Sequence, residues 1–138
     1  MSKLIKSIAK DLGCDYVYDD WGRINLYADR IKKDVLVAEV IPMGGKINTK
    51  HMPVMVTSKS TMVAFLTPCN LDFTGDEVGN KIDAMLEVCK EFLQRYSEAE
   101  GVDILPDSIT YNNVLDFLDA NMCGVRVTID ITDLGGCK

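Results

Sequence analysis

The segment that begins at residue 74 carries the strongest helix signal in this chain. Thr74 and Glu77 fit a capping box at its start, and Phe73 and Val78 occupy the two positions of a hydrophobic staple. Beyond them, apolar side chains recur at alternating steps of four and three residues, which predicts one apolar face along a helix about 33 Å long. This face consists of Val78, Ile82, Met85, Cys89, Phe92 and Tyr96. A helix of this length is expected to cross one face of a small sheet, with Cys89 buried beneath it.

A second strong pattern lies near the end of the chain, where residues 123–132 alternate between apolar and polar or small side chains. A period of two predicts a half-buried strand, with Ile129 facing the core and Asp130 facing solvent. Residues 109–118 fit a partner strand joined to it by a turn at 119–122. A short helix over residues 109–118 is the alternative, and the hairpin is the favoured interpretation.

The beginning of the chain predicts a helix followed by a hairpin. Residues 2–12 have the apolar spacing of a short amphipathic helix, and Gly13 stands where such a helix ends. Residues 14–18 and 24–26 alternate on either side of the turn-rich segment 19–22. This arrangement is typical of two paired strands.

The middle of the chain is rich in residues that favour strands. Residues 35–41 are almost wholly apolar, which indicates an inner strand of the sheet. Residues 42–53 begin with Pro42 and two glycines and predict a flexible connection. Residues 54–57 and 61–67 then form either one interrupted strand or a hairpin about residues 58–60.

These elements together predict an α+β fold. We expect a mainly antiparallel sheet of five to six strands, with an N-terminal helix and one long amphipathic helix packed on one face. The polar segment 97–108, which contains Gly101 and Pro106, is expected to be a mobile loop. A chain of 138 residues is in the usual range for one hydrophobic core, so residues 1–138 are expected to form a single domain.

Charge and cysteine usage exclude several classes of function. The 21 acidic and 15 basic residues give a net charge of −6, and the lysines and arginines are scattered, so no specific nucleic-acid binding is expected. The five cysteines include no C-x-x-C pair, which argues against a zinc site or a redox pair. No apolar run approaches the roughly 20 residues that cross a bilayer, so we expect no membrane association and free thiols in a reducing cytoplasm.

The sequence contains no recognisable catalytic constellation. His51 is the only histidine, and it stands in a predicted loop without a neighbouring cysteine or carboxylate. The acidic groups Asp19 with Asp20, and Asp76 with Glu77, are interpreted as turn and helix-start residues rather than as acid–base pairs. We therefore expect no enzyme activity, no catalytic residue, no metal and no cofactor.

Two predicted loops instead have the character of a protein interface. Trp21 lies at the tip of the predicted hairpin, where a tryptophan either folds onto the core or contacts a partner. Methionines surround the connection after residue 42, and they suit either core filling or adaptable contacts. We take Trp21, Met43, Lys46 and His51 as candidate subunit-interface residues.

Three stretches give the chain a resemblance to a known group of proteins. Residues 16–23 (YVYDDWGR) follow the first helix, residues 62–68 (MVAFLTP) precede the long helix, and residues 124–131 (GVRVTIDI) form the last strand. In this succession the chain resembles the tail-terminator, or tail-completion, proteins of long-tailed bacteriophages, their relatives among phage neck proteins, and prophage proteins of gut bacteria.

The resemblance implies a structural role in the virion. Such proteins form a ring, usually of six subunits, that stops growth of the tail tube and supplies the surface to which the head docks. The implied partners are further copies of the chain, the tail-tube protein and head-completion proteins, and no cofactor is implied. The implied location is the host cytoplasm during assembly and then the virion. The alternative function is a small cytoplasmic binding or adaptor domain, monomeric or dimeric, without catalytic activity.

Overall fold

The computed structural model describes residues 3–24, 34–42, 44–50, 52–69, 74–99, 109–117 and 122–131. Helices and strands follow one another along the chain as α1 (Lys3–Asp11), β1 (Asp15–Asp19), α2 (Trp21–Ile24), β2 (Leu36–Val40), β3 (Gly44–Asn48), β4 (Met55–Pro68), α3 (Gly75–Glu98), β5 (Tyr111–Phe117) and β6 (Met122–Ile131).

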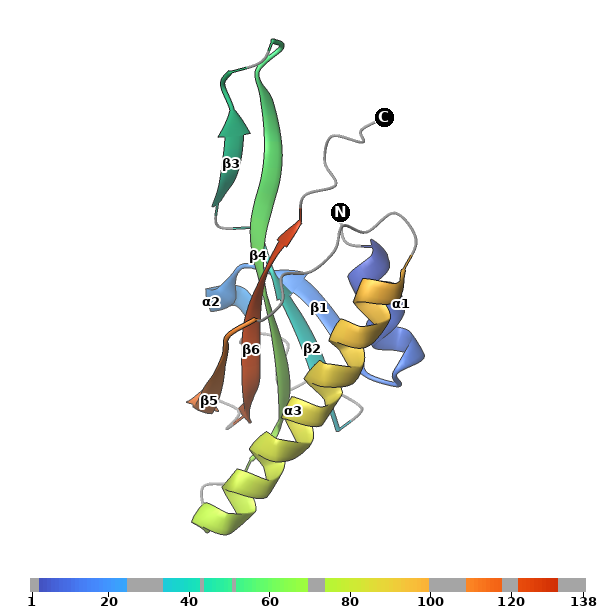
Figure 1. Cartoon of the computed structure of the whole chain (residues 1–138). Coiled ribbons are helices and arrows are strands. Elements are labelled where there is room, and N and C mark those ends of the chain that lie inside the picture. Colours follow the sequence, from blue (N-terminus) through green and yellow to red (C-terminus); the bar gives the residue numbers. More distant parts are fainter. Residues whose placement is uncertain are drawn as a thin grey trace.

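The strands form one six-stranded sheet in the order β1-β2-β4-β6-β5, with β3 paired to β4 beyond this row. β1 and β2 are parallel, and the other pairs are antiparallel. The helices α1 and α3 pack against the sheet, and α3 crosses it diagonally (Figure 1). The predicted α+β fold, a mainly antiparallel sheet with an N-terminal helix and a long helix on one face, is confirmed.

The long helix begins and packs as its sequence predicts. Thr74 Oγ1 accepts a hydrogen bond from the backbone N–H of Glu77 at 3.2 Å, and Glu77 Oε1 accepts one from the N–H of Thr74 at 2.9 Å, so the capping box is confirmed. Phe92 lies edge-on to Phe65 of β4, with ring centroids 5.2 Å apart. The buried residues of α3 are Met85, Cys89, Phe92 and Tyr96, whereas Val78 and Ile82 are half-buried. Phe73, the proposed staple residue, lies outside the described residues.

The sheet is buried on its other face as well. A second apolar cluster on that face includes Leu36, Ala38 and Val40 of β2 and Met62, Ala64 and Leu66 of β4. Ile24 of α2 belongs to this cluster and is fully buried. β2 and residues 62–66 of β4 are therefore packed on both sides, as expected for the apolar run at residues 35–41.

Several open alternatives are settled by the strands. β4 is one continuous strand, so no hairpin forms about residues 58–60. β5 is a strand paired antiparallel with β6, which confirms the hairpin over the helix for residues 109–118. The predicted turn has its residues 119–121 outside the described part of the chain.

The predicted hairpin at residues 14–26 is wrong. The segment after β1 is the short helix α2, and β1 pairs with β2 in parallel. Asp20 explains the helical turn, because its carboxylate accepts a hydrogen bond from the N–H of Arg23 at 2.8 Å and its carbonyl accepts one from Ile24 N–H at 3.1 Å. Burial of Ile24 against the second face of the sheet then fixes the turn in place.

The flexible connection predicted for residues 42–53 is also corrected, because it contains the strand β3. Gly44 and Gly45 adopt extended backbone opposite Ser60 and Lys59. The segment has a weak strand propensity, and it forms a strand because it pairs with β4.

The ends of the two longer helices can also be compared with the prediction. α3 continues to Glu98, two residues into the predicted loop, and residues 100–108 lie outside the described part. α1 ends before Gly13, which has a φ of 78° and confirms the predicted stop.

Candidate functional site

β3 and the first part of β4 form a two-stranded arm that projects beyond the rest of the sheet (Figure 1). We define this arm as residues 44–50 and 52–60. β6 ends at Ile131, which pairs with Lys59, so the residues of β4 before Lys59 have only β3 as a partner strand within the described chain. An isolated two-stranded ribbon is only marginally stable in water, so contacts with another surface are expected to stabilise the arm.

The arm exposes apolar side chains in place of the polar ones that usually cover a solvated ribbon. Ile47 and Val56 are register partners across the two strands, and 62% and 43% of their surfaces are exposed. Met52 and Val54, between the strands, are exposed as well, Met52 to 85%. Clustered exposed apolar residues of this kind are typical of a contact surface.

An apolar groove of about 490 Å³ lies at the base of the arm, where β1 and β2 end. Tyr18, Ile41 and Pro42 form the side of the groove nearest the body of the sheet. The arm contributes Ile47, Val56 and Lys59. The groove makes the exposed apolar surface of the arm continuous with that of the sheet edge.

The arm differs in charge from the rest of the chain. Its lysines are Lys46, Lys50 and Lys59, and no aspartate or glutamate occurs anywhere from residue 40 to residue 71. The whole chain nevertheless carries a net charge of −6. The arm is therefore a basic and apolar element attached to an acidic body.

The candidate interface residues named from the sequence are only partly placed. Lys46 lies on β3 with an exposed side chain and lines the groove at the base of the arm. Trp21 is the first residue of α2, directly after β1 and Asp20. Met43 and His51 lie outside the described residues, so the structure does not test their roles.

The apolar part of this surface is not apparent from the sequence. Ile47 lies in a predicted connection and Val56 in a predicted strand, and nothing in local periodicity indicates that they face solvent. The missing signal was the charge distribution, since the absence of acidic residues from 40 to 71 coincides with the arm and with the strand that carries it.

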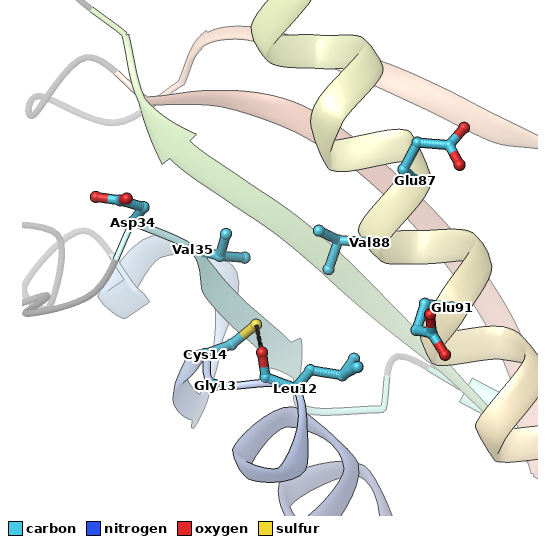
Figure 2. Close-up of a pocket in the computed structure, with 8 residues that line it drawn as sticks. All are labelled: Leu12, Gly13, Cys14, Asp34, Val35, Glu87, Val88 and Glu91. Atoms are coloured by element: carbon cyan, nitrogen blue, oxygen red, sulfur yellow. Dashed lines mark hydrogen bonds between the residues drawn. The ribbon is translucent and has the colours of Figure 1, made fainter.

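A second groove, of about 610 Å³, lies at the opposite end of β1 and β2 (Figure 2). Leu12 and Val35 line it from the segments that precede the two strands, and Val88 points toward Val35 from α3. Three carboxylates stand around these apolar residues: Asp34, Glu87 and Glu91. We call this feature the acidic groove.

Two carboxylates of the acidic groove form exposed ion pairs along α3. Glu87 pairs with Lys90 at 3.1 Å and Glu91 with Arg95 at 3.3 Å, and all four side chains are largely exposed. Exposed pairs of this kind contribute little stability. Among the residues that the structure describes, no three His, Cys, Asp or Glu side chains form a group that could hold a metal ion.

The body contains a buried carboxyl group that is hydrogen-bonded. Glu39 is only 1% exposed, and its Oε1 accepts a hydrogen bond from the hydroxyl of Tyr16. Burial and this bond to Glu39 raise the pKa of Tyr16 well above its usual value. Burial likewise raises the pKa of the Cys89 thiol to about 11, which keeps it protonated and unreactive near neutral pH.

The described helices include none with the length and apolar character needed to cross a membrane.

The arm, the groove at its base and the acidic groove together constitute the candidate site. Comparison of the chain with protein-family models, with curated proteins and with solved structures finds no match.

Proposed function

We propose that this protein is a structural assembly protein of a bacteriophage tail, a ring-forming terminator that ends tail-tube growth and joins the tail to the head. The single observation that best supports the proposal is the arm, a two-stranded ribbon with exposed apolar side chains on an otherwise well-packed domain. A ribbon of this kind gains its stability from contacts with a partner.

Self-association is the economical way to cover such a surface. A ring requires two different patches on each subunit that fit one another, and the arm is one patch that a neighbouring copy can cover. The resemblance to tail terminators supplies the expected number of six subunits and the expected partners, the tail-tube and head-completion proteins. In this role the chain assembles in the host cytoplasm and stays in the virion, and it uses no cofactor.

The groove at the base of the arm favours one alternative, a small binding or adaptor domain. Its volume of about 490 Å³ is enough for a few side chains of a bound peptide, and Tyr18 and Ile41 give it an apolar wall. In that function the protein would be a monomer or dimer, and the arm would close on the ligand instead of on another subunit.

Molar mass in solution separates the two functions. The chain has a mass of 15.3 kDa, so a six-membered ring has about 92 kDa. We expect light scattering over a range of protein concentrations to show growth toward that mass, and electron microscopy to show closed rings. A protein that stays at 15.3 kDa at every concentration, with and without purified tail tubes, would contradict the proposed function.

A further inference from the structure

We infer that the arm of one copy docks in the acidic groove of the next copy, with lysines of the arm facing Asp34, Glu87 and Glu91. The inference rests on the proposed function, because it names the two patches that self-assembly would join. It assigns the acidic groove a protein ligand, the basic and apolar β-ribbon of another copy. The contact between the copies is then head-to-tail.

The placement of the two surfaces makes the contact one between different copies. β1 and β2 run parallel, so their first residues share one end of the sheet and their last residues share the other. Leu12, Cys14 and Val35 of the acidic groove lie just before these strands, whereas the arm begins after β2 ends at Val40. The arm also extends away from that end, so it points away from the groove of its own chain (Figure 1).

A head-to-tail contact follows from this geometry. Each copy offers its arm at one end and its groove at the other, which makes the interface heterologous. Repetition of a heterologous contact produces a ring where the rotation closes and a filament where it does not.

The chemistry of the two surfaces is complementary in its apolar part. The arm presents Ile47 and Val56, which are adjacent across its two strands and exposed. The groove presents Leu12, Val35 and Val88 between its carboxylates. Docking removes both sets of side chains from water, which is the main favourable contribution to association.

The charges are complementary as well. Lys46 and Lys50 are exposed on an arm without any acidic residue, and the groove carries three carboxylates. Lys90 and Arg95 on α3 already contact two of these carboxylates, but exposed pairs one helical turn apart exchange readily with other cations. Opposite charges across an interface raise the association rate and select the partner, and salt weakens both effects.

The same lysines are compatible with a phosphate backbone, but the arm favours a protein partner. Ile47, Val54 and Val56 are exposed between the lysines, and a nucleic-acid backbone offers these side chains no apolar surface to cover. The body of the protein is acidic and would repel a polyanion. Binding of the arm to DNA would therefore contradict the inference.

Charge reversal in the 138-residue chain tests the inference. The arm variant carries Lys46→Glu and Lys50→Glu, and the groove variant carries Glu87→Lys and Glu91→Lys. Each variant alone places like charges across the contact, and we expect at least about a tenfold weaker self-association in light scattering at low salt. An equimolar mixture restores assembly, because every arm then finds a groove of opposite charge in the other variant.

Matched controls separate this effect from a general change in charge. Lys6→Glu on α1 and Glu98→Lys at the end of α3 are exposed positions outside both surfaces, and we expect them to leave assembly unchanged. Thermal unfolding of each variant shows whether it folds. If the two lysines on α3 lower the melting temperature, Asp34→Lys tests the groove from the segment before β2 without changing the helix.

The outcomes distinguish the inference from the proposed function. If the wild-type protein assembles and the variants assemble equally well, the arm-to-groove contact is overturned and ring formation is not. The same holds if the wild-type protein assembles but the mixture of variants does not recover assembly. Wild-type protein that never assembles overturns both. Binding of the wild-type arm to double-stranded DNA at physiological salt, lost in the arm variant while self-association persists, also overturns the inference.

Discussion

The two parts of β4 share one strand but differ in their surroundings. Residues 61–67 are buried, with Val63 and Phe65 facing the helices and Met62 and Leu66 facing the second apolar cluster. At the other end of the strand, Val56 is exposed and pairs with an exposed residue of β3. The boundary lies near Ser60, whose hydroxyl donates to the carboxylate of Asp130 at 2.6 Å close to the end of β6.

The difference shows that strand propensity and burial are separate properties. Both parts of β4 contain β-branched residues, and both pair antiparallel with a neighbouring strand, although the pairing with β3 shifts register between Lys46 and Ile47. Residues 63–66 have neighbouring strands on both edges and packing on both faces, whereas the residues of β4 before Lys59 pair with β3 alone among the described strands. We therefore expect the body to be stable by itself and the arm to be stabilised by what it contacts.

The largest expected effect comes from removing the close contact between β4 and β6 in the body. A Cβ atom at Gly124 would lie 1.8 Å from the carbonyl oxygen of Phe65, so Gly124→Ala forces the two strands apart. We expect a loss of about 4 kcal/mol or more in the free energy of unfolding, measured by urea denaturation.

Gly79→Ala is the matched control for this substitution. Gly79 lies in α3 with no atom within 4 Å of the added Cβ, and alanine favours a helix by about 0.5 to 1 kcal/mol over glycine. A stabilised Gly79→Ala variant beside a destabilised Gly124→Ala variant confirms the close approach. A Gly124→Ala variant as stable as the wild-type protein would show that β4 and β6 can separate without cost.

The next effect tests the alternation of β6, opposite the body part of β4. Ile129 is buried beneath the helices, and Asp130 is exposed. We expect Ile129→Ala to cost about 2 to 5 kcal/mol of unfolding free energy, and Asp130→Ala, which loses one exposed hydrogen bond from Ser60, at most about 1 kcal/mol. Similar costs at the two positions would place Asp130 inside the body.

The buried body was largely predictable because periodicity reports which face of an element is covered. Among the described side chains, the six-residue stripe of α3 and the alternation of β6 identify core residues, although Val78 and Ile82 are less buried than the pattern indicates. Those two lie in the first turns of α3. Periodicity specifies a face, but it does not specify where along the helix the sheet ends.

The arm and the turn after β1 were not predictable in the same way. β3 contains two glycines, a lysine and an asparagine, and it becomes a strand because β4 extends past its pairing with β2, which ends at Val63, and offers a free edge there. α2 depends on the Asp20 cap and on burial of Ile24 against a distant part of the sheet. β3 and the buried position of Ile24 therefore depend on tertiary contacts, which local sequence patterns do not encode, whereas the Asp20 cap is a local signal.

A smaller effect concerns the pH dependence of the body. The pKa of the buried Cys89 thiol is about 11 in the folded protein, against an ordinary value of 9.0. Because the pKa is higher in the folded than in the unfolded protein, the protonated thiol contributes fully to the free energy of unfolding below pH 9. This contribution is lost as the pH rises toward 11. The difference corresponds to about 2 to 3 kcal/mol of unfolding free energy.

The measurement compares stability at pH 8 and pH 11 in wild-type protein and in Cys89→Ala. The variant is expected to lose less stability over this range, because its unfolded chain no longer gains from ionising that thiol. At pH 8, thiol reagents are expected to modify Cys89 only as fast as the protein unfolds. Rapid labelling in the folded protein would instead mean that α3 lifts from the sheet.

The smallest effect on stability is expected in the arm, and it tests the comparison most directly. Replacing Ile47 and Val56 with threonine keeps the β-branched shape that favours strands and removes apolar surface that is already exposed. In the monomer, the free energy of unfolding is expected to change by less than about 0.5 kcal/mol. The measurement requires protein dilute enough to be monomeric, because association adds to apparent stability.

The same substitution in the body provides the contrast. Val127→Thr introduces a hydroxyl at a buried position opposite Val63, and we expect it to cost about 1 to 3 kcal/mol.

In the assembly assay the arm variant is expected to show the larger effect of the two. It loses the burial of two side chains at the contact and should associate at least about tenfold more weakly. Val127→Thr, where it folds, should associate normally because the residue is remote from the arm. An arm variant that is destabilised as a monomer yet assembles like wild type would mean that Ile47 and Val56 pack within their own chain, and the distinction between a self-sufficient body and a contact-dependent arm would then be lost.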